Sequence, residues 1–167
     1  MKIKEINGKF SIVDFDEIEA YMIACKIERD GIRFYSKLSE RSQDPVAKET
    51  LEFLLSEEKR HFKLFDDALG ILRNSREIQE DNDLLQSMDF GIFEPYASMD
   101  ELETIVTDIK KALRLGIVIE NKSIALYQAC VNALQASGAG EAGKELECII
   151  DEEKKHKALL ENLLQKA

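Results

Sequence analysis

The sequence is poor in residue types that several protein classes require. It has no tryptophan, two prolines and three cysteines in 167 residues, and no two cysteines form a Cys-x-x-Cys pair. The scattered Cys25, Cys130 and Cys148 therefore exclude a zinc ribbon or a rubredoxin-type iron site and argue against a disulfide framework. No apolar run approaches the ~18 residues of a membrane span, and no signal peptide is apparent near Met1. We expect a cytoplasmic protein without a membrane partner.

Negative charge is abundant instead. Charged residues make up 34% of the chain, hydrophobic residues 44%, and the formal net charge is −10. This composition is typical of a helix-rich globular protein, and the length suffices for one domain with a substantial core. The acidic balance argues against nucleic acid as a partner.

Turn signals divide the chain into four predicted helices. A short N-terminal tail or extended segment over residues 1–13 precedes a domain over residues 14–167. Asp14 is the expected cap of a first helix, and Asp44 with Pro45 starts a second. The expected helices cover residues 15–39, 45–73, 108–136 and 141–167, with a crossover over 74–98 that has no clean period. Two helical hairpins joined by one long connection predict an all-α, antiparallel four-helix bundle.

Both histidines of the chain end the same kind of pentad, Glu-Glu-Lys-x-His. The two pentads are Glu57–His61 and Glu152–His156. Residues three apart lie on one face of a helix, so each pentad directs a glutamate and its histidine to one point. The halves also repeat, because Glu28 precedes Tyr35 by seven residues and Glu120 precedes Tyr127 by seven.

The expected core stripes are apolar except near the middle of each helix. Alternating spacings of three and four place Ile32, Ala68 and Ile124 on these stripes. Six polar residues interrupt them: Glu28, Glu58, His61, Glu120, Glu153 and His156. No lysine or arginine shares a stripe, and an uncompensated buried charge costs several kcal/mol. Two divalent cations would balance four carboxylates, so we predict a dinuclear site, for which iron or manganese is more natural than zinc.

Several neighbouring residues have open roles. The hydroxyls of Tyr35 and Tyr127 could bond a ligand or stabilise an oxidised centre, or both rings could be ordinary core aromatics. Glu57 and Glu152 fall beside the stripes and are expected to face solvent or lie behind the ligands. Asp151 is a candidate partner of His156.

The combined pattern resembles the rubrerythrin-type branch of the ferritin-like di-iron carboxylate proteins. A single glutamate with Phe-Tyr or Leu-Tyr ending seven residues on, followed by Glu-Glu-Lys-x-His, occurs in both halves, and the resemblance covers residues 15–73 and 108–164. It implies a ferritin-like bundle with a di-iron centre. The implied carboxylate ligands are Glu28, Glu58, Glu120 and Glu153. Of these, Glu58 and Glu153 are the expected bridges, and His61 and His156 are the terminal nitrogen ligands.

The resemblance also implies a function. We expect an oxidoreductase that acts on hydrogen peroxide or O2; the alternatives are a ferroxidase or iron-binding or storage protein, and a structural bundle with a vestigial site. Electrons would come from an external electron-transfer protein, because the missing cysteine pairs leave no rubredoxin-like domain. Ser123 stands where rubrerythrins typically carry an extra glutamate.

A homodimer is expected by analogy with this family. The apolar side chains of the crossover could form its interface, or could pack within their own subunit; they are Met88, Phe90, Phe93 and Tyr96.

Overall fold

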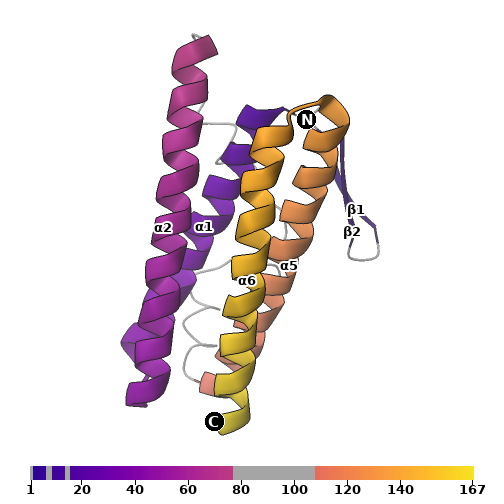
Figure 1. The fold of residues 1–167 in the computed structure, drawn as a ribbon. Helices are drawn as coiled ribbons and strands as arrows, with labels where there is room; N and C mark the ends of the chain where they lie inside the picture. Colours follow the sequence, from indigo (N-terminus) through magenta and orange to yellow (C-terminus); the bar gives the residue numbers. More distant parts are fainter. Residues whose placement is uncertain (1, 7–8, 14–15, 77–107) are drawn as a thin grey trace.

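Four long helices form the body of the protein. The structure is a computed structural model, and it describes residues 2–6, 9–13, 16–76 and 108–167. The helices are α1 (Glu17–Arg41), α2 (Pro45–Arg76), α5 (Ile109–Ser137) and α6 (Gly140–Lys166). Helix α1 packs with α2, and α5 with α6, as two antiparallel hairpins that lie side by side (Figure 1). This arrangement confirms the predicted all-α, ferritin-like four-helix bundle.

Aspartate side chains cap the beginnings of α1, α2 and α5. Asp16, rather than the predicted Asp14, caps α1: its carboxylate accepts from the Glu19 amide at 2.9 Å, and Glu19 accepts from the Asp16 amide at 3.1 Å. Asp44 caps α2 as predicted, accepting from the Ala47 amide at 2.7 Å. Asp108 caps α5 by accepting from the Lys111 amide at 3.1 Å.

The ends of the helices differ from the predicted ends by one to three residues. Helix α2 continues to Arg76, beyond the predicted end at residue 73. Gly138 ends α5 with φ of 84°, a left-handed conformation that glycine adopts without a steric cost. Most of the predicted crossover, including the four apolar side chains of the expected dimer interface, lies outside the described residues.

An N-terminal hairpin takes the place of the predicted tail. Strands β1 (Lys2–Ile6) and β2 (Lys9–Val13) pair antiparallel, with Lys2 opposite Val13 and Ile6 opposite Lys9. The extended conformation agrees with the sequence, but the pairing was not predicted. Strand β2 packs along α5 (Figure 1), away from α2.

The core register follows the predicted stripes with a few shifts of one position. Gly31 and Ser123 are buried, whereas the neighbouring Ile32 and Ile124, predicted in the core, are half-buried. In α2, Leu69 is buried instead of Ala68. Because the helical period is 3.6 residues, either of two adjacent residues can face the core. Near Glu28 and Glu120 the smaller of the two faces it.

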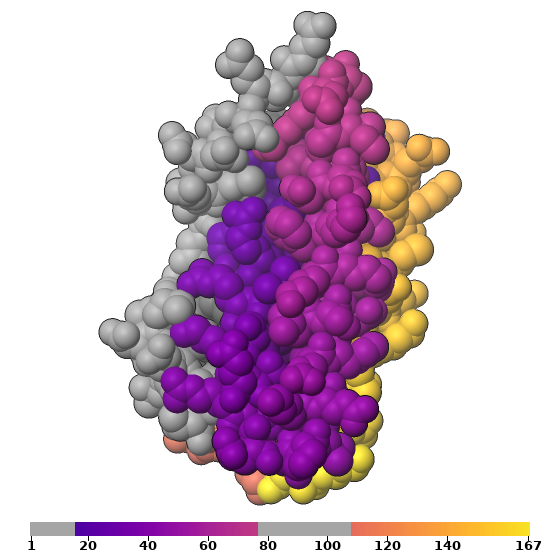
Figure 2. Space-filling model, turned by 90° about the vertical axis from the view of Figure 1, so that its left-hand side faces the viewer, coloured from indigo at the N-terminus to yellow at the C-terminus, as the bar shows by residue number. Residues whose placement is uncertain are grey.

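Helix α2 lies between α1 and α6 on one face of the molecule (Figure 2). Across the described ranges, no helix combines the length and the apolar character needed to cross a membrane.

Candidate metal centre

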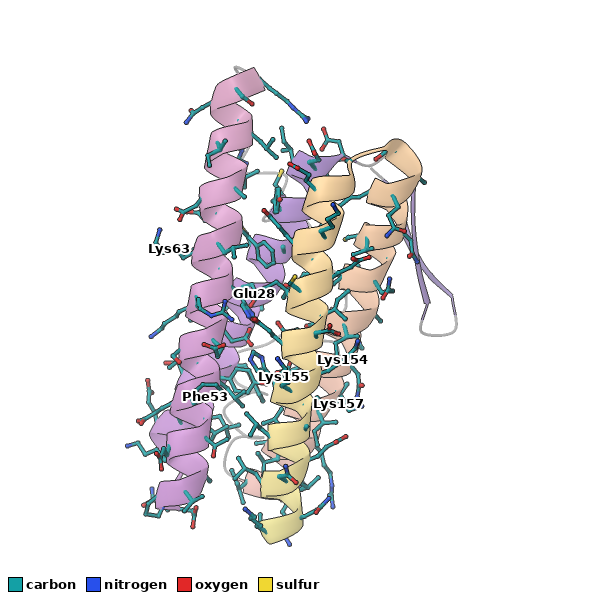
Figure 3. All side chains as sticks on the ribbon, in the orientation of Figure 1. Glu28, Phe53, Lys63, Lys154, Lys155 and Lys157 are labelled. Atoms are coloured by element: carbon teal, nitrogen blue, oxygen red, sulfur yellow. The ribbon has the colours of Figure 1, made fainter. Side chains whose placement is uncertain are left out.

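The six polar residues that interrupt the core stripes converge inside the bundle. Each is between 0% and 4% exposed to solvent. Helices α1 and α5 contribute one glutamate each, and α2 and α6 each contribute a glutamate and a histidine three residues later. The members of this cluster are Glu28, Glu58, His61, Glu120, Glu153 and His156. Figure 3 shows Glu28 between the helices near mid-height of the bundle.

The cluster contains two overlapping sets of four potential ligands. In each set the ligand atoms all lie within 4.8 Å of one another. One set is Glu28, Glu58, His61 and Glu153; the other is Glu58, Glu120, Glu153 and His156. Glu58 and Glu153 belong to both sets. This sharing is the geometry required of carboxylates that bridge two cations, the role that the resemblance implies for them.

Both imidazoles direct Nδ1 towards the carboxylates. Nδ1 of His61 lies 3.2 Å from Glu153 Oε1 and 3.5 Å from Glu28 Oε2. Nδ1 of His156 lies 2.9 Å from Glu153 Oε2 and 3.6 Å from Glu58 Oε1. The two rings stack with centroids 5.5 Å apart. The site therefore offers one potential nitrogen ligand for each set of carboxylates.

The donor set fits divalent cations. Three buried atoms have no hydrogen-bond partner among the described residues, and they are Glu28 Oε2, Glu58 Oε1 and His61 Nδ1. Such unpaired polar atoms are costly in a protein interior unless a ligand satisfies them. Four carboxylates and two neutral imidazoles balance the charge of two divalent ions, and this oxygen-rich set suits iron or manganese.

The electrostatics of the cluster show the same demand for positive charge. Burial raises the pKa of Glu28, Glu58 and Glu120, and repulsion between neighbouring carboxylates adds to it. Glu153 is the exception: burial opposes its ionisation, but the neighbouring imidazoles of His156 and His61 hold its pKa near 2. His61 has a pKa of about 10, because Glu153 and Glu28 outweigh the effect of burial. Bound cations would replace these protons.

The two tyrosines connect the two halves of the site crosswise. The Tyr35 hydroxyl on α1 donates to Glu120 on α5, and the Tyr127 hydroxyl on α5 donates to Glu28 on α1. Both rings are fully buried. Burial raises the pKa of each phenol well above its ordinary value, and nearby carboxylates raise it further. Both hydroxyls therefore stay protonated, and each orients one carboxylate of the cluster.

A charged group outside the cluster orients His61. The Nε2 atom of His61 lies 2.7 Å from Glu152 Oε2, so an Nε2–H donor leaves Nδ1 free for a cation. Arg60 bonds the same Glu152 and also Glu57, at 3.0 Å. Despite partial burial, the bonds to His61 and Arg60 lower the pKa of Glu152. Glu152 thus lies behind a ligand, one of the two placements expected for it.

Asp151 and Glu57 are the other two residues near the pentads for which the sequence suggested a role. Asp151 is not the partner of His156: it is exposed and pairs with Lys154 at 2.8 Å. Glu57 forms a third group of potential ligands, with His61 and His156.

A glycine that the sequence analysis did not single out makes room for the Glu58 carboxylate. A Cβ atom on Gly31 would lie 2.2 Å from Glu58 Oε2. Gly31 follows Glu28 by three residues, one helical turn away on the same face. Its signal in the sequence is a glycine in mid-helix, where the residue costs about 0.5–1 kcal/mol relative to alanine unless packing requires it. Ser123 stands at the matching position after Glu120 and is also buried.

Four antiparallel helices that surround two glutamates and two Glu-x-x-His pairs define a ferritin-like carboxylate bundle. Residues 3–69 match the family model described as Rubrerythrin. The chain is 38% identical over 50 residues to an uncharacterized protein of Archaeoglobus fulgidus, an alignment that spans 30% of this chain and 78% of that protein.

A solved structure extends this similarity to most of the chain. It is the crystal structure of a Thermotoga maritima protein provisionally described as a ferritin-like diiron-carboxylate protein, with a TM-score of 0.64 and 26% identity, and the match covers 90% of this chain and 95% of that one. Residues 3–69 are thus similar to rubrerythrins, and most of the chain has the fold of a ferritin-like di-iron carboxylate protein. Family and ligand clusters together indicate iron binding.

Proposed function

We propose that this protein is a non-heme di-iron oxidoreductase that reduces hydrogen peroxide with electrons from an external donor protein. The observation that carries the proposal is the sharing of Glu58 and Glu153 between two complete ligand sets. Two cations held by common carboxylates can act together on one small substrate. A homodimer in the cytoplasm, with iron in both positions, is part of the proposal.

The chain's own residues hold and shield the centre. Glu28 and His61 would bind one ion, and Glu120 and His156 the other, with the shared carboxylates between them. Tyr35 and Tyr127 orient the two terminal carboxylates through hydrogen bonds. Bound ferrous iron would supply Lewis acidity and one electron per ion.

Peroxide reduction needs two electrons and two protons and yields two water molecules. In this proposal the two electrons would come from the bound iron pair, and the external donor would restore both. The electron balance requires neither a cysteine nor a further cofactor.

Anaerobic loading with two ferrous ions per chain provides the test. One equivalent of hydrogen peroxide should oxidise both ions. The absorbance of the iron and the amount of peroxide consumed would monitor this oxidation. Glu58→Ala should keep the helical circular dichroism spectrum but hold no iron pair. A loaded wild-type protein that peroxide leaves ferrous would contradict the proposal.

The same experiment distinguishes the alternative, a ferroxidase or iron-storage protein. That function predicts faster oxidation by O2 than by peroxide and uptake of iron well beyond two ions per chain. Storage also requires a multimeric shell, so size-exclusion chromatography with light scattering would separate it from a dimer.

A further inference from the structure

A cavity of about 700 Å³ lies between α2 and α6 and opens to solvent. Thr50 and Phe53 on α2 and Leu159 on α6 form part of its wall. Figure 3 shows Phe53 and Lys155 on the two helices at this level of the bundle. Phe53 is 49% exposed, which is unusual for a large apolar side chain and leaves its ring available to a ligand.

The cavity reaches the candidate metal centre. His156, which is 2% exposed and belongs to the second ligand set, lines it. Glu57, whose carboxylate belongs to the group with His61 and His156, lines it too. A molecule bound in the cavity would therefore have one end beside the ligands of the centre.

The cavity is much larger than hydrogen peroxide requires. A water molecule occupies about 30 Å³ in the liquid, and hydrogen peroxide has only one more oxygen atom. Cavities of 300–1,000 Å³ are typical of sites for organic ligands, roughly the class to which this cavity belongs. Its volume and the apolar part of its wall, formed by Phe53, Ala158 and Leu159, thus point to a substrate with a carbon skeleton.

The charges around the cavity favour a neutral molecule. Arg60 bonds both Glu57 and Glu152, so its single positive charge offsets one of their two negative charges. Of the remaining charged residues in the wall, Glu49 is acidic and Lys155 is basic. Lys155 forms no ion pair with any residue in the described part of the chain. A carboxylate-bearing ligand would meet the net negative charge of this wall.

We propose that the cavity binds the organic group of a neutral alkyl or aryl hydroperoxide and directs its peroxide end towards His156. This inference rests on the proposed function and specifies its substrate class. The reaction is ROOH + 2 e⁻ + 2 H⁺ → ROH + H2O: the O–O bond breaks, the C–O bond remains, and two ferrous ions give one electron each. The external donor then reduces both ions again.

Binding is tested first, without any turnover. The probe is 2-phenyl-2-propanol, the alcohol formed from cumene hydroperoxide, added to the metal-free protein and to the manganese-loaded protein. Titration followed by NMR should shift the signals of Thr50, Phe53 and Leu159. Ala158→Trp, an exposed position in the cavity wall, should fill the space and weaken binding by about tenfold or more, or ~1.4 kcal/mol.

A matched control places the same substitution outside the cavity. Ala136 on α5 is exposed and does not line it, so Ala136→Trp should leave the dissociation constant unchanged. Absence of saturable shifts in the wild type, or equal weakening by both substitutions, would overturn the proposal.

The reaction arm separates this inference from the proposed function. Cumene hydroperoxide should oxidise the ferrous wild-type protein, and Ala158→Trp should slow that oxidation while leaving the rate with hydrogen peroxide within about twofold. If hydrogen peroxide reacts and cumene hydroperoxide does not, only the inference fails. If neither peroxide reacts, both fail.

Discussion

Tyr127 on α5 donates a hydrogen bond to Glu28 on α1, 99 positions earlier in the chain. The reciprocal bond runs from Tyr35 on α1 to Glu120 on α5. Each half of the chain therefore orients a predicted ligand of the other half. The hairpins are joined at the centre by polar contacts as well as by apolar packing, which ties the geometry of the site to the docking of the two halves.

Tyr127→Phe should weaken metal binding without unfolding the protein. Glu28 would lose the donor that fixes its carboxylate, and loss of such a partner typically costs about 10–100-fold in metal affinity. Competition with a chelator would measure the change. Tyr21→Phe is the matched control, because Tyr21 donates to Glu145 at 2.5 Å outside the metal cluster. The metal affinity of this variant should equal that of the wild type. Equal losses in the two variants would contradict the assigned role of Tyr127.

Gly31→Ala should displace the carboxylate of Glu58. The added Cβ would lie 2.2 Å from Glu58 Oε2, so the carboxylate or α1 must move. We expect a loss of about 1–3 kcal/mol in the free energy of unfolding, typical of an overpacked core, together with weaker metal binding. Urea unfolding and metal titration would measure the two effects.

Gly70→Ala provides the control for that substitution. Gly70 lies inside α2, and apart from the backbone around it no heavy atom of the described residues lies within 4 Å of a Cβ at this position. Alanine there should stabilise the helix by about 0.5–1 kcal/mol and leave metal affinity unchanged. The idea is wrong if Gly31→Ala behaves in the same way.

Glu152→Gln should reduce metal affinity through His61. The Glu152 carboxylate accepts from Nε2 of His61 at 2.7 Å and makes that ring a better ligand at Nδ1. We expect a decrease of roughly tenfold or more, measured by competition with a chelator. Asp151→Asn, next in sequence but exposed and paired with Lys154, should have no effect. A wild-type affinity in Glu152→Gln would show that His61 needs no such partner.

Metal should reverse the pH dependence of stability. Burial raises the folded-state pKa of Glu58 and Glu120 well above 4.5. Their contribution is thus fully present below pH 4.5 and is lost as pH rises towards the folded-state pKa. His61, with a folded-state pKa of about 10 against 6.5, loses its contribution as pH rises through 10. Glu153, with a pKa of about 2, loses its contribution only when pH falls through 2.

The metal-free protein should therefore become less stable between pH 5 and 9. Bound manganese, which requires deprotonated ligands, should stabilise it more as pH rises. Urea unfolding with a chelator or with manganese, across this pH range, would show the two opposite slopes. A metal-free stability that increases with pH would mean that the buried carboxylates are compensated in another way.

Much of the site could be predicted because helical periodicity is local. A glutamate and a histidine three residues apart share a face in any helix, and an acid on an apolar stripe must become buried when that stripe forms the core. Glu58 and Glu153 were thus distinguished from their neighbours Glu57 and Glu152 by register alone. The cap of α2 at Asp44 was equally predictable, since it depends on residues 44–47.

The core register at Gly31 and the partner of His61 were not predicted, because both depend on contacts with another helix. Whether Ile32 or Gly31 faces the core differs by one position on the helix, and only the Glu58 carboxylate opposite decides it. The partner of His61 could not be read from its own helix, because Glu152 comes from α6.

The amino-acid sequence by itself determined four amphipathic helices, their pairing into hairpins and the identity of six buried polar residues. These follow from spacing, capping and the cost of burying charge. Only the tertiary structure decided which tyrosine meets which glutamate, where a glycine makes room, and that a cavity between α2 and α6 reaches His156. Contacts between helices depend on their axial and rotational offsets, which no pattern within one helix specifies.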